Sequence, residues 1–386
     1  MLAGAMTSSQ PSPLVPELAQ GIDDAGFAIL RAAAHDGGNV VVSPVSIGLA
    51  FGMADAGASG RLADALARAF SLPAAGERRW TAFDAYRRRL VRAVGEEAPA
   101  VTIANRVFTD AAFTPRTDYA EVVERWFDAG AESVPMRQAP QDAAARIDAW
   151  VAERTGGLIR DLVSDASFDE ASRLMLVNAL AMRARWREPL DAAETTDEPF
   201  TLLDGTEVTA PLMDATATAT GVAERPDCVA ASLAYAGESL EMVVIVPHAR
   251  RFTEVRDRLG AALLEELDAS WLDIPFSVAI PRFEAASTVE LSDVMECALG
   301  ITDVFATPGL DRIAPDLVID GALHAARVIV DEEGTEAAAA TAIDIAVTGM
   351  PLRFLDVRAD RPFLYVIRDV DTGAALFAGQ VINPAL

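Results

Sequence analysis

The sequence contains no lysine, so all 32 of its basic residues are arginine. This absence excludes a P-loop lysine, a Schiff-base lysine and a lysine general base. Three histidines (His35, His248 and His324) and two cysteines (Cys228 and Cys297) are too few and too scattered for a zinc finger or another Cys/His cage. There is also no Gly-x-Ser-x-Gly nucleophile motif. We therefore expect no metal, no cofactor and no conventional active site, and a protein that is not an enzyme.

Positive charge is scarce as well. The chain has 58 acidic residues against 32 basic ones, which gives a net charge of −26 with the histidines neutral. Binding to nucleic acid requires a basic face, and an anionic membrane surface repels an acidic protein. The sequence therefore predicts neither nucleic acid nor membrane as a partner. Hydrophobic residues make up 51% of the chain, which is enough for a large core.

The chain offers little sign of a targeting or membrane segment. Its first 20 residues have no basic residue ahead of an apolar stretch, unlike a signal peptide. On this ground we expect a cytoplasmic protein, with an extracellular one as the alternative. The longest uncharged stretch, residues 37–54, contains Asn39 and Ser43-Pro44, which favours a strand followed by a core helix over a bilayer span. The exclusive use of arginine is typical of a GC-rich, bacterial genome.

Helical and strand patterns alternate along the chain without a linker. This predicts a single α+β domain over residues 18–386, preceded by a flexible N-terminal segment at residues 1–17. Hydrophobic periodicity and capping residues predict helices at 18–34, 44–58, 61–70, 78–94, 118–128 and 141–162. Apolar or alternating runs predict strands at 39–42, 101–108, 172–185, 229–235, 241–246, 276–282, 317–330, 362–370 and 374–382.

One segment departs from these patterns. Residues 331–341 read Asp-Glu-Glu-Gly-Thr-Glu-Ala-Ala-Ala-Ala-Thr. Helix propensity favours a helix there, but the segment has no apolar stripe to pack against a core. It is either an exposed connection or a run of small residues able to enter a sheet as an added strand, which bulky or charged residues could not do. As a strand, one face would carry Thr335, Ala337, Ala339 and Thr341, and the other Glu336, Ala338 and Ala340.

The segment at residues 331–341 resembles the corresponding segment of the serpin family. Other motifs extend the resemblance from about residue 18 to the end of the chain. Leu190 departs from the family pattern, in which an aromatic residue is usual. The matching motifs are Ser43-Pro44-Val45-Ser46; Leu176-Val177-Asn178-Ala179 with Trp186 eight residues after Asn178; Leu299-Gly300-Ile301-Thr302 followed by Phe305; His324 ten residues before Gly334; Arg361-Pro362-Phe363; and residues 377–384.

The resemblance implies the serpin fold, with a mixed central β-sheet, smaller sheets, a helical cluster and an exposed reactive-centre loop at about residues 332–352. It also implies a suicide-substrate inhibitor. A target serine protease attacks the loop and forms an acyl-enzyme, and the cut loop then inserts into the central sheet and traps the protease. The expected protein is a monomer whose partner is that protease. Some serpins are noninhibitory binding proteins or chaperones, but the small residues at Thr335 and 337–340 favour inhibition.

The family's usual spacing also locates the bond that is cut. The seventeenth residue counted from Glu332 is Thr348, which predicts cleavage between Thr348 and Gly349. The bond between Val347 and Thr348 is the alternative. Cleavage before Pro351 is disfavoured because proline after the bond hinders most serine proteases. The small, uncharged bait predicts an elastase-like or subtilisin-like target rather than a trypsin-like one.

Several further residues receive a role from the resemblance. Asn178 and His324 resemble a pair, called the shutter, that holds the sheet closed, and Ser43 and Ser46 belong to it. Trp186 resembles the tryptophan where insertion starts, called the breach, and Arg282 stands where the family places a cation facing Glu332. The mobile part of the loop, called the hinge, would comprise Glu332, Gly334, Thr335, Glu336, Ala337, Ala338, Ala339, Ala340 and Thr341.

A basic run lies on the helix predicted at 78–94. Some serpins bind a glycosaminoglycan on the corresponding helix. We interpret the run instead as a solvated face that balances nearby acids. It consists of Arg78, Arg79, Arg87, Arg88, Arg89 and Arg92.

Overall fold

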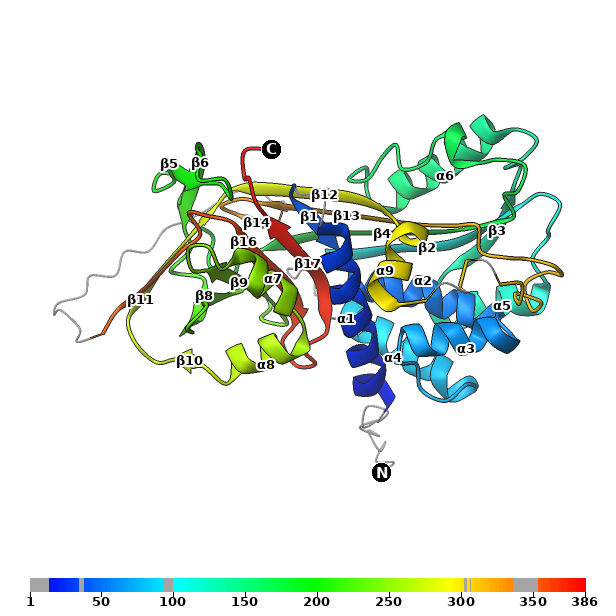
Figure 1. Ribbon diagram of the computed structural model, residues 1–386, viewed down its shortest axis with the longest axis horizontal. Coiled ribbons are helices and arrows are strands. Elements are labelled where there is room, and N and C mark those ends of the chain that lie inside the picture. The colour runs from blue at the N-terminus through cyan, green and yellow to red at the C-terminus, as the bar shows by residue number, and fades with distance from the viewer. Residues whose placement is uncertain (1–13, 35–37, 93–99, 302–303, 306, 336–352) are drawn as a thin grey trace, which may run out of the picture.

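The computed structural model describes residues 14–34, 38–92, 100–301, 304–305, 307–335 and 353–386. In this part of the chain, no helix combines the length and the apolar character that crossing a membrane would need. Most of the helices gather on one half of the molecule, and the smaller sheets lie on the other half together with the short helices at residues 252–258 and 261–268 (Figure 1). The helices are α1 (Leu14–Ala33), α2 (Pro44–Gly57), α3 (Gly60–Ala69), α4 (Glu77–Arg92), α5 (Thr117–Phe127), α6 (Pro140–Arg154), α7 (Phe252–Arg258), α8 (Ala261–Asp268) and α9 (Leu291–Leu299).

A long central sheet runs through the whole molecule in the order β12-β13-β4-β2-β3, and a short strand β14 pairs with β4. The central strands β4 and β13 are parallel, and β2 and β12 flank them in antiparallel pairing. The strands of this sheet are β2 (Ala100–Asp110), β3 (Gly130–Val134), β4 (Leu174–Arg185), β12 (Phe283–Glu290), β13 (Gly321–Val330) and β14 (Gly334–Thr335).

Two smaller sheets complete the fold. One has the order β1-β17-β16-β9-β8-β7-β10, and the other the order β15-β11-β6-β5. Their strands are β1 (Val40–Val42), β5 (Thr196–Thr201), β6 (Glu207–Asp214), β7 (Ala219–Glu224), β8 (Cys228–Ala234), β9 (Leu240–Pro247), β10 (Trp271–Leu272), β11 (Phe276–Pro281), β15 (Leu355–Arg358), β16 (Phe363–Asp369) and β17 (Ala375–Val381).

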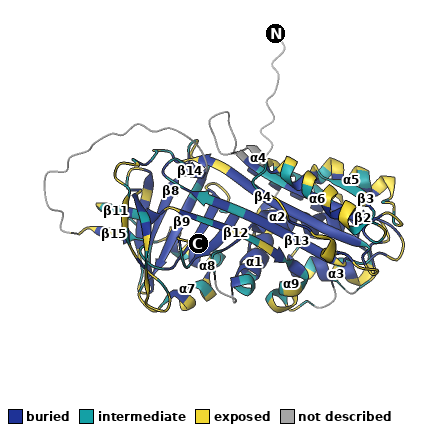
Figure 2. Cartoon of the chain, turned by 90° about the horizontal axis from the view of Figure 1, so that it is seen from above, coloured by how far each residue is buried: buried dark blue, intermediate teal, exposed yellow. Residues whose placement is uncertain are grey.

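The helix α2 is the central element of the larger core. Ser43 caps its N-terminus by accepting a hydrogen bond from the Ser46 backbone N–H, and Pro44 occupies the first helical position, as its fixed φ favours. Every residue of α2 is buried, because the helix packs between the central sheet and α1, α4 and α5. Figure 2 shows this buried centre and the exposed outer faces of α3, α5 and α6.

A second, smaller core lies on the opposite face of the central sheet. It forms between α6, the connector that follows it (residues 155–173), and the outward side chains of β2, β4 and β13. The predicted helix at 141–162 is therefore wrong at its end. Gly156 and Gly157 adopt positive φ values of 61° and 81° and direct the chain across the sheet instead.

The N-terminal boundary also differs from the prediction. The helix α1 begins at Leu14 and buries Val15, so residues 14–17 of the expected N-terminal segment belong to the folded domain.

Candidate functional site: the hinge and the closed central sheet

The strands β4 and β13 separate at one end of the sheet, and β14 begins a new strand between them. The pairing of β13 with β4 ends at Arg327 and Ala181. Beyond that point Gly334 pairs with Arg185 and Thr335 with Ala184, both antiparallel, while Gly334 also bridges to Asp331. Gly334 has φ +141°, and a Cβ atom there would lie 2.1 Å from the Ala184 carbonyl oxygen. Only glycine fits this tight approach.

Thr335 is fully buried at the tip of β14. Its hydroxyl lies 3.0 Å from the hydroxyl of Tyr235, which is also buried. Tyr235 in turn stacks on Trp186, with ring centroids 4.7 Å apart and planes at 10°. The predicted breach residue Trp186 therefore reaches the hinge through a second aromatic ring.

Trp186 also holds the turn that precedes β14. Its indole N–H donates to the Asp331 carbonyl at 2.9 Å, and its backbone N–H donates to the Glu333 carbonyl at 2.9 Å. The Leu190 N–H donates to the Glu332 carbonyl at 2.7 Å. Three hydrogen bonds from one segment thus fix the backbone of residues 331–333.

Glu332 and Arg282 are brought together as the resemblance implied. Arg282 donates to both carboxylate oxygens, at 2.5 and 3.2 Å, and the Thr195 hydroxyl donates at 2.7 Å. Burial opposes the ionisation of Glu332, but the hydrogen bonds from Arg282 and Thr195 outweigh it, and the pKa of Glu332 falls below its ordinary value. A charged Glu332 is consequently held at the base of the hinge.

The four predicted shutter residues also meet. Asn178 donates to the carbonyl oxygen of Ser46 at 2.6 Å and to the Ser46 hydroxyl, and its own side-chain oxygen pairs with Nδ1 of His324. The backbone N–H of Ser43 donates to Nε2 of His324 at 2.9 Å. All four residues are at most 1% exposed. The network therefore ties β4, β13 and α2 to one another across the sheet.

These hydrogen bonds assign the charge state of His324. Nε2 accepts a hydrogen bond from a backbone N–H, so the single ring proton sits on Nδ1 and is donated to Asn178. Burial lowers the pKa of His324 to about 3, because removal from water disfavours the charged imidazolium. The shutter histidine is neutral at physiological pH.

Sequence reasoning missed two members of these networks. Tyr235 ends a strand that the sequence predicted, but nothing in the sequence pairs it with Thr335 across 100 residues. Asn105 accepts a hydrogen bond from the Asn178 side chain. Its signal was a polar residue on a strand face that otherwise carries Val101, Ile103 and Val107.

Other predicted site residues lie outside the described residues. These are Glu336, Ala337, Ala338, Ala339, Ala340 and Thr341 of the hinge, and Thr348 and Gly349 of the expected bond.

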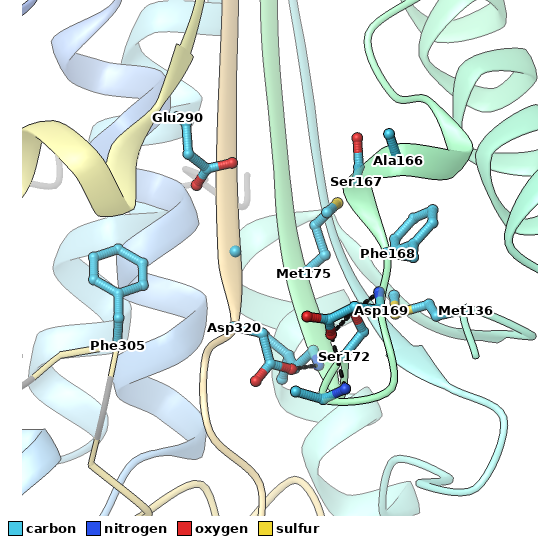
Figure 3. A pocket seen from close by; sticks show the side chains of 13 residues that line it. Met136, Ala166, Ser167, Phe168, Asp169, Ser172, Met175, Glu290, Phe305 and Asp320 are labelled. Carbon is cyan, nitrogen blue, oxygen red and sulfur yellow. Dashed lines mark hydrogen bonds between the residues drawn. The ribbon is translucent and has the colours of Figure 1, made fainter.

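A cavity of about 390 Å³ lies at the opposite end of β4 and β13. Asp169, Ser172 and Met175 face it from one side, and Glu290 and Phe305 from the other (Figure 3). Its carboxylates already serve the backbone: Glu290 accepts from the Ala322 N–H at 3.0 Å, and Asp320 accepts from the Leu174 N–H at 2.9 Å. Across the described part of the chain, no three His, Cys, Asp or Glu side chains are arranged to hold a metal ion.

The arginine run of α4 is largely occupied by internal ion pairs. Arg79 forms a buried pair with Asp55 at 2.7 Å, and Arg88 pairs with Asp84 at 2.8 Å. Arg87 also pairs with Asp84, and Arg89 pairs with Asp369 at the end of β16 and with Asp371 in the turn that follows. These contacts support the interpretation of the run as a face balanced by acids.

Comparison with known proteins agrees with this geometry. The family model described as serpin (serine protease inhibitor) matches residues 20–384. The chain belongs to the serpin family. Its relatives include an uncharacterized serpin-like protein of Thermococcus kodakarensis, which is 31% identical over 98% of this chain and 88% of its own length. Serpin-ZXA of Oryza sativa subsp. japonica is also 31% identical, over 93% of this chain and 94% of its own.

The fold comparison gives the same result. AtSerpin1 of Arabidopsis, solved in a native stressed conformation, superimposes with a TM-score of 0.83 over 96% of this chain and 99% of its own, at 24% identity. The predicted serpin fold, with helices and three sheets in an α+β arrangement, is thus confirmed. The family is one of protease inhibitors.

Proposed function

We propose that this serpin inhibits serine proteases as a suicide substrate rather than acting as an enzyme, and that its targets are elastase-like or subtilisin-like. The observation that carries the proposal is the position of Thr335, which is fully buried as the second residue of a strand between β4 and β13. After one charged residue, Glu336, comes the run of small residues that an insertable strand requires, Ala337 to Ala340.

Extending β14 in its present register gives a specific path. Each further residue advances by one along β4 and β13, so Glu336 would pair with Arg183, and Thr341 would arrive between Asn178 and His324. Thr335, Ala337, Ala339 and Thr341 would then face the larger core. Insertion therefore has to break the Asn178–His324 hydrogen bond and replace it with hydrogen bonds of the added strand.

The same step has to open the second core. Outward side chains of β4 and of β13 pack together beneath α6 and the connector. Separating the two strands costs these contacts, while the added strand gains backbone hydrogen bonds on both of its edges. A barrier of this kind accounts for an uncut protein that is trapped kinetically rather than at its lowest free energy.

The test is incubation of the chain with pancreatic elastase and with subtilisin. We expect an adduct that survives denaturing SDS electrophoresis, cleavage after Thr348 by mass spectrometry, and no adduct with a protease whose catalytic serine is replaced by alanine. The loop-cleaved protein should melt more than about 10 °C above the uncut one, since an added strand is worth several kcal/mol. Clean cleavage with no adduct would instead favour a noninhibitory serpin.

A further inference from the structure

Phe354 is an exposed aromatic residue at the point where the chain re-enters the fold after the bait. Its side chain is 53% exposed, and among the described residues only Leu203, Val370 and Leu386 are other large hydrophobic side chains of comparable exposure. It is the single aromatic residue in that set. A partner that covers an exposed phenylalanine removes its apolar surface from water, which stabilises the complex.

Contacts on both sides anchor the chain at Phe354, an exposed side-chain ion pair before it and backbone pairing after it. Arg353 donates to Glu224 at the end of β7 at 2.8 Å, and the Leu355 N–H donates to the Pro275 carbonyl at 3.2 Å before β15 pairs with β11. The neighbouring Ile274 and Phe276 are only half-buried. Phe354 is therefore presented on a rigid support, which lowers the entropic cost of binding through it.

Chain length places Phe354 within reach of a bound protease. Between Thr348 and Phe354 lie five residues, which span at most about 21 Å in six extended steps. A protease–inhibitor interface buries about 800 Å² on each partner, which corresponds to a patch about 30 Å across. A patch of this size centred on either expected bond, Thr348–Gly349 or Val347–Thr348, extends about 15 Å from it, so the protease covers Phe354 in any complex in which the intervening residues are less than fully extended.

We propose that Phe354, beside the Arg353–Glu224 ion pair, is a contact site for the target protease outside the bait sequence. The partner it fits is a protease with an apolar surface next to the subsites that bind the residues after the cut bond. Buried aromatic side chains of this kind dominate binding energy at interfaces, while the surrounding polar pair excludes water. This inference rests on the proposed function, because it takes the target protease as the occupant.

The experiment compares Phe354→Ala with Val370→Ala, which truncates a side chain of similar exposure (48%) in the turn between β16 and β17. The measured quantity is the second-order rate constant for cutting the intact loop by pancreatic elastase and by subtilisin. A synthetic peptide of residues 336–352, which lacks Phe354, is cut in parallel to give the rate constant for the bait sequence alone. We expect Phe354→Ala to slow cutting of the whole protein about tenfold, with Val370→Ala and the melting temperatures unchanged.

Two results would overturn the inference. One is a rate for Phe354→Ala within twofold of the wild type with both proteases. The other is a wild-type protein that elutes as a dimer and a Phe354→Ala protein that elutes as a monomer, because a second copy would then cover the patch. The proposed function fails separately: loop cutting without an SDS-resistant adduct refutes inhibition, yet the effect of Phe354 on the cutting rate still decides the contact site.

Discussion

At the scale of single residues, the proposed insertion predicts that Thr335 decides whether the hinge can enter the sheet. The substitution Thr335→Arg places a guanidinium where the side chain is fully buried and hydrogen-bonds Tyr235. A buried, unpaired charge costs several kcal/mol, so insertion slows and hydrolysis of the acyl-enzyme overtakes it. We expect the variant to be cut as a substrate, with a stoichiometry of inhibition raised at least about tenfold.

The matched control for this variant is Thr335→Ser, which keeps the hydroxyl that faces Tyr235 and adds no volume. It should retain the wild-type stoichiometry within about twofold, since it loses a single methyl group. The measurement is residual protease activity across a titration with inhibitor. An arginine variant that inhibits as efficiently as the serine variant would contradict the role given to β14.

At the scale of elements, the sequence predicted the central pieces well because each carries its own local signal. Ser43-Pro44 starts α2 as expected, and the apolar run at 172–185 becomes β4 at Leu174–Arg185. It did not reveal the end of α6 at Arg154, nor β3, β7, β10, β12, β15, α7, α8 and α9. Those elements depend on tertiary contacts: β12 mixes polar and small residues and is held by its pairing with β13.

The candidate site also contains residues that the sequence predicted and residues that it did not. The family motifs predicted that Asn178 meets His324 and that Glu332 meets Arg282, because each of these residues lies in or next to a motif whose place in the fold the family defines. The sequence did not predict the connector over the second core, because the helical pattern of α6 continues past Gly156 and Gly157. Besides its apolar contacts in the second core, the connector is tied to β13 by Arg327, which donates to the Leu158 carbonyl at 2.9 Å and to Glu284 of β12 at 2.8 Å.

Removing the hydrogen bonds of Arg327 should ease the separation of β4 from β13. The substitution Arg327→Met keeps the apolar stem but removes both hydrogen bonds, which contribute about 1 kcal/mol at a partly exposed site. We expect the uncut protein to accept a synthetic peptide of residues 336–347 as an added strand about fivefold faster. Native gel electrophoresis over time follows the annealing.

Arg160→Met is the control for the connector. Arg160 donates to the Gly157 carbonyl at 3.0 Å within the connector itself, so its loss leaves the contact with β13 intact. The annealing rate of this variant should match the wild type. Equal acceleration by both substitutions would mean that the connector loosens as a whole and that Arg327 has no special part in holding the sheet closed.

At the scale of the whole molecule, the neutral shutter histidine makes the closed sheet sensitive to acid. His324 has a pKa of about 3 in the folded protein and about 6.5 when unfolded. Between these values the unfolded chain binds a proton that the folded chain does not. The stability that His324 contributes is therefore complete above about pH 6.5 and is lost as the pH falls towards 3, by up to about 1.4 kcal/mol per pH unit.

Comparison with His324→Gln isolates this contribution, because a glutamine amide can accept from Ser43 and donate to Asn178 without titrating. Buried carboxyls such as Asp23 and Asp320 have raised pKa values and act in the opposite direction, but they are common to both proteins and cancel in the difference. From pH 7.5 to pH 5, the unfolding midpoint of the wild type should fall further than that of the variant. Parallel profiles would show that protonation of His324 does not open the sheet, and that acid acts on this serpin through other titratable groups.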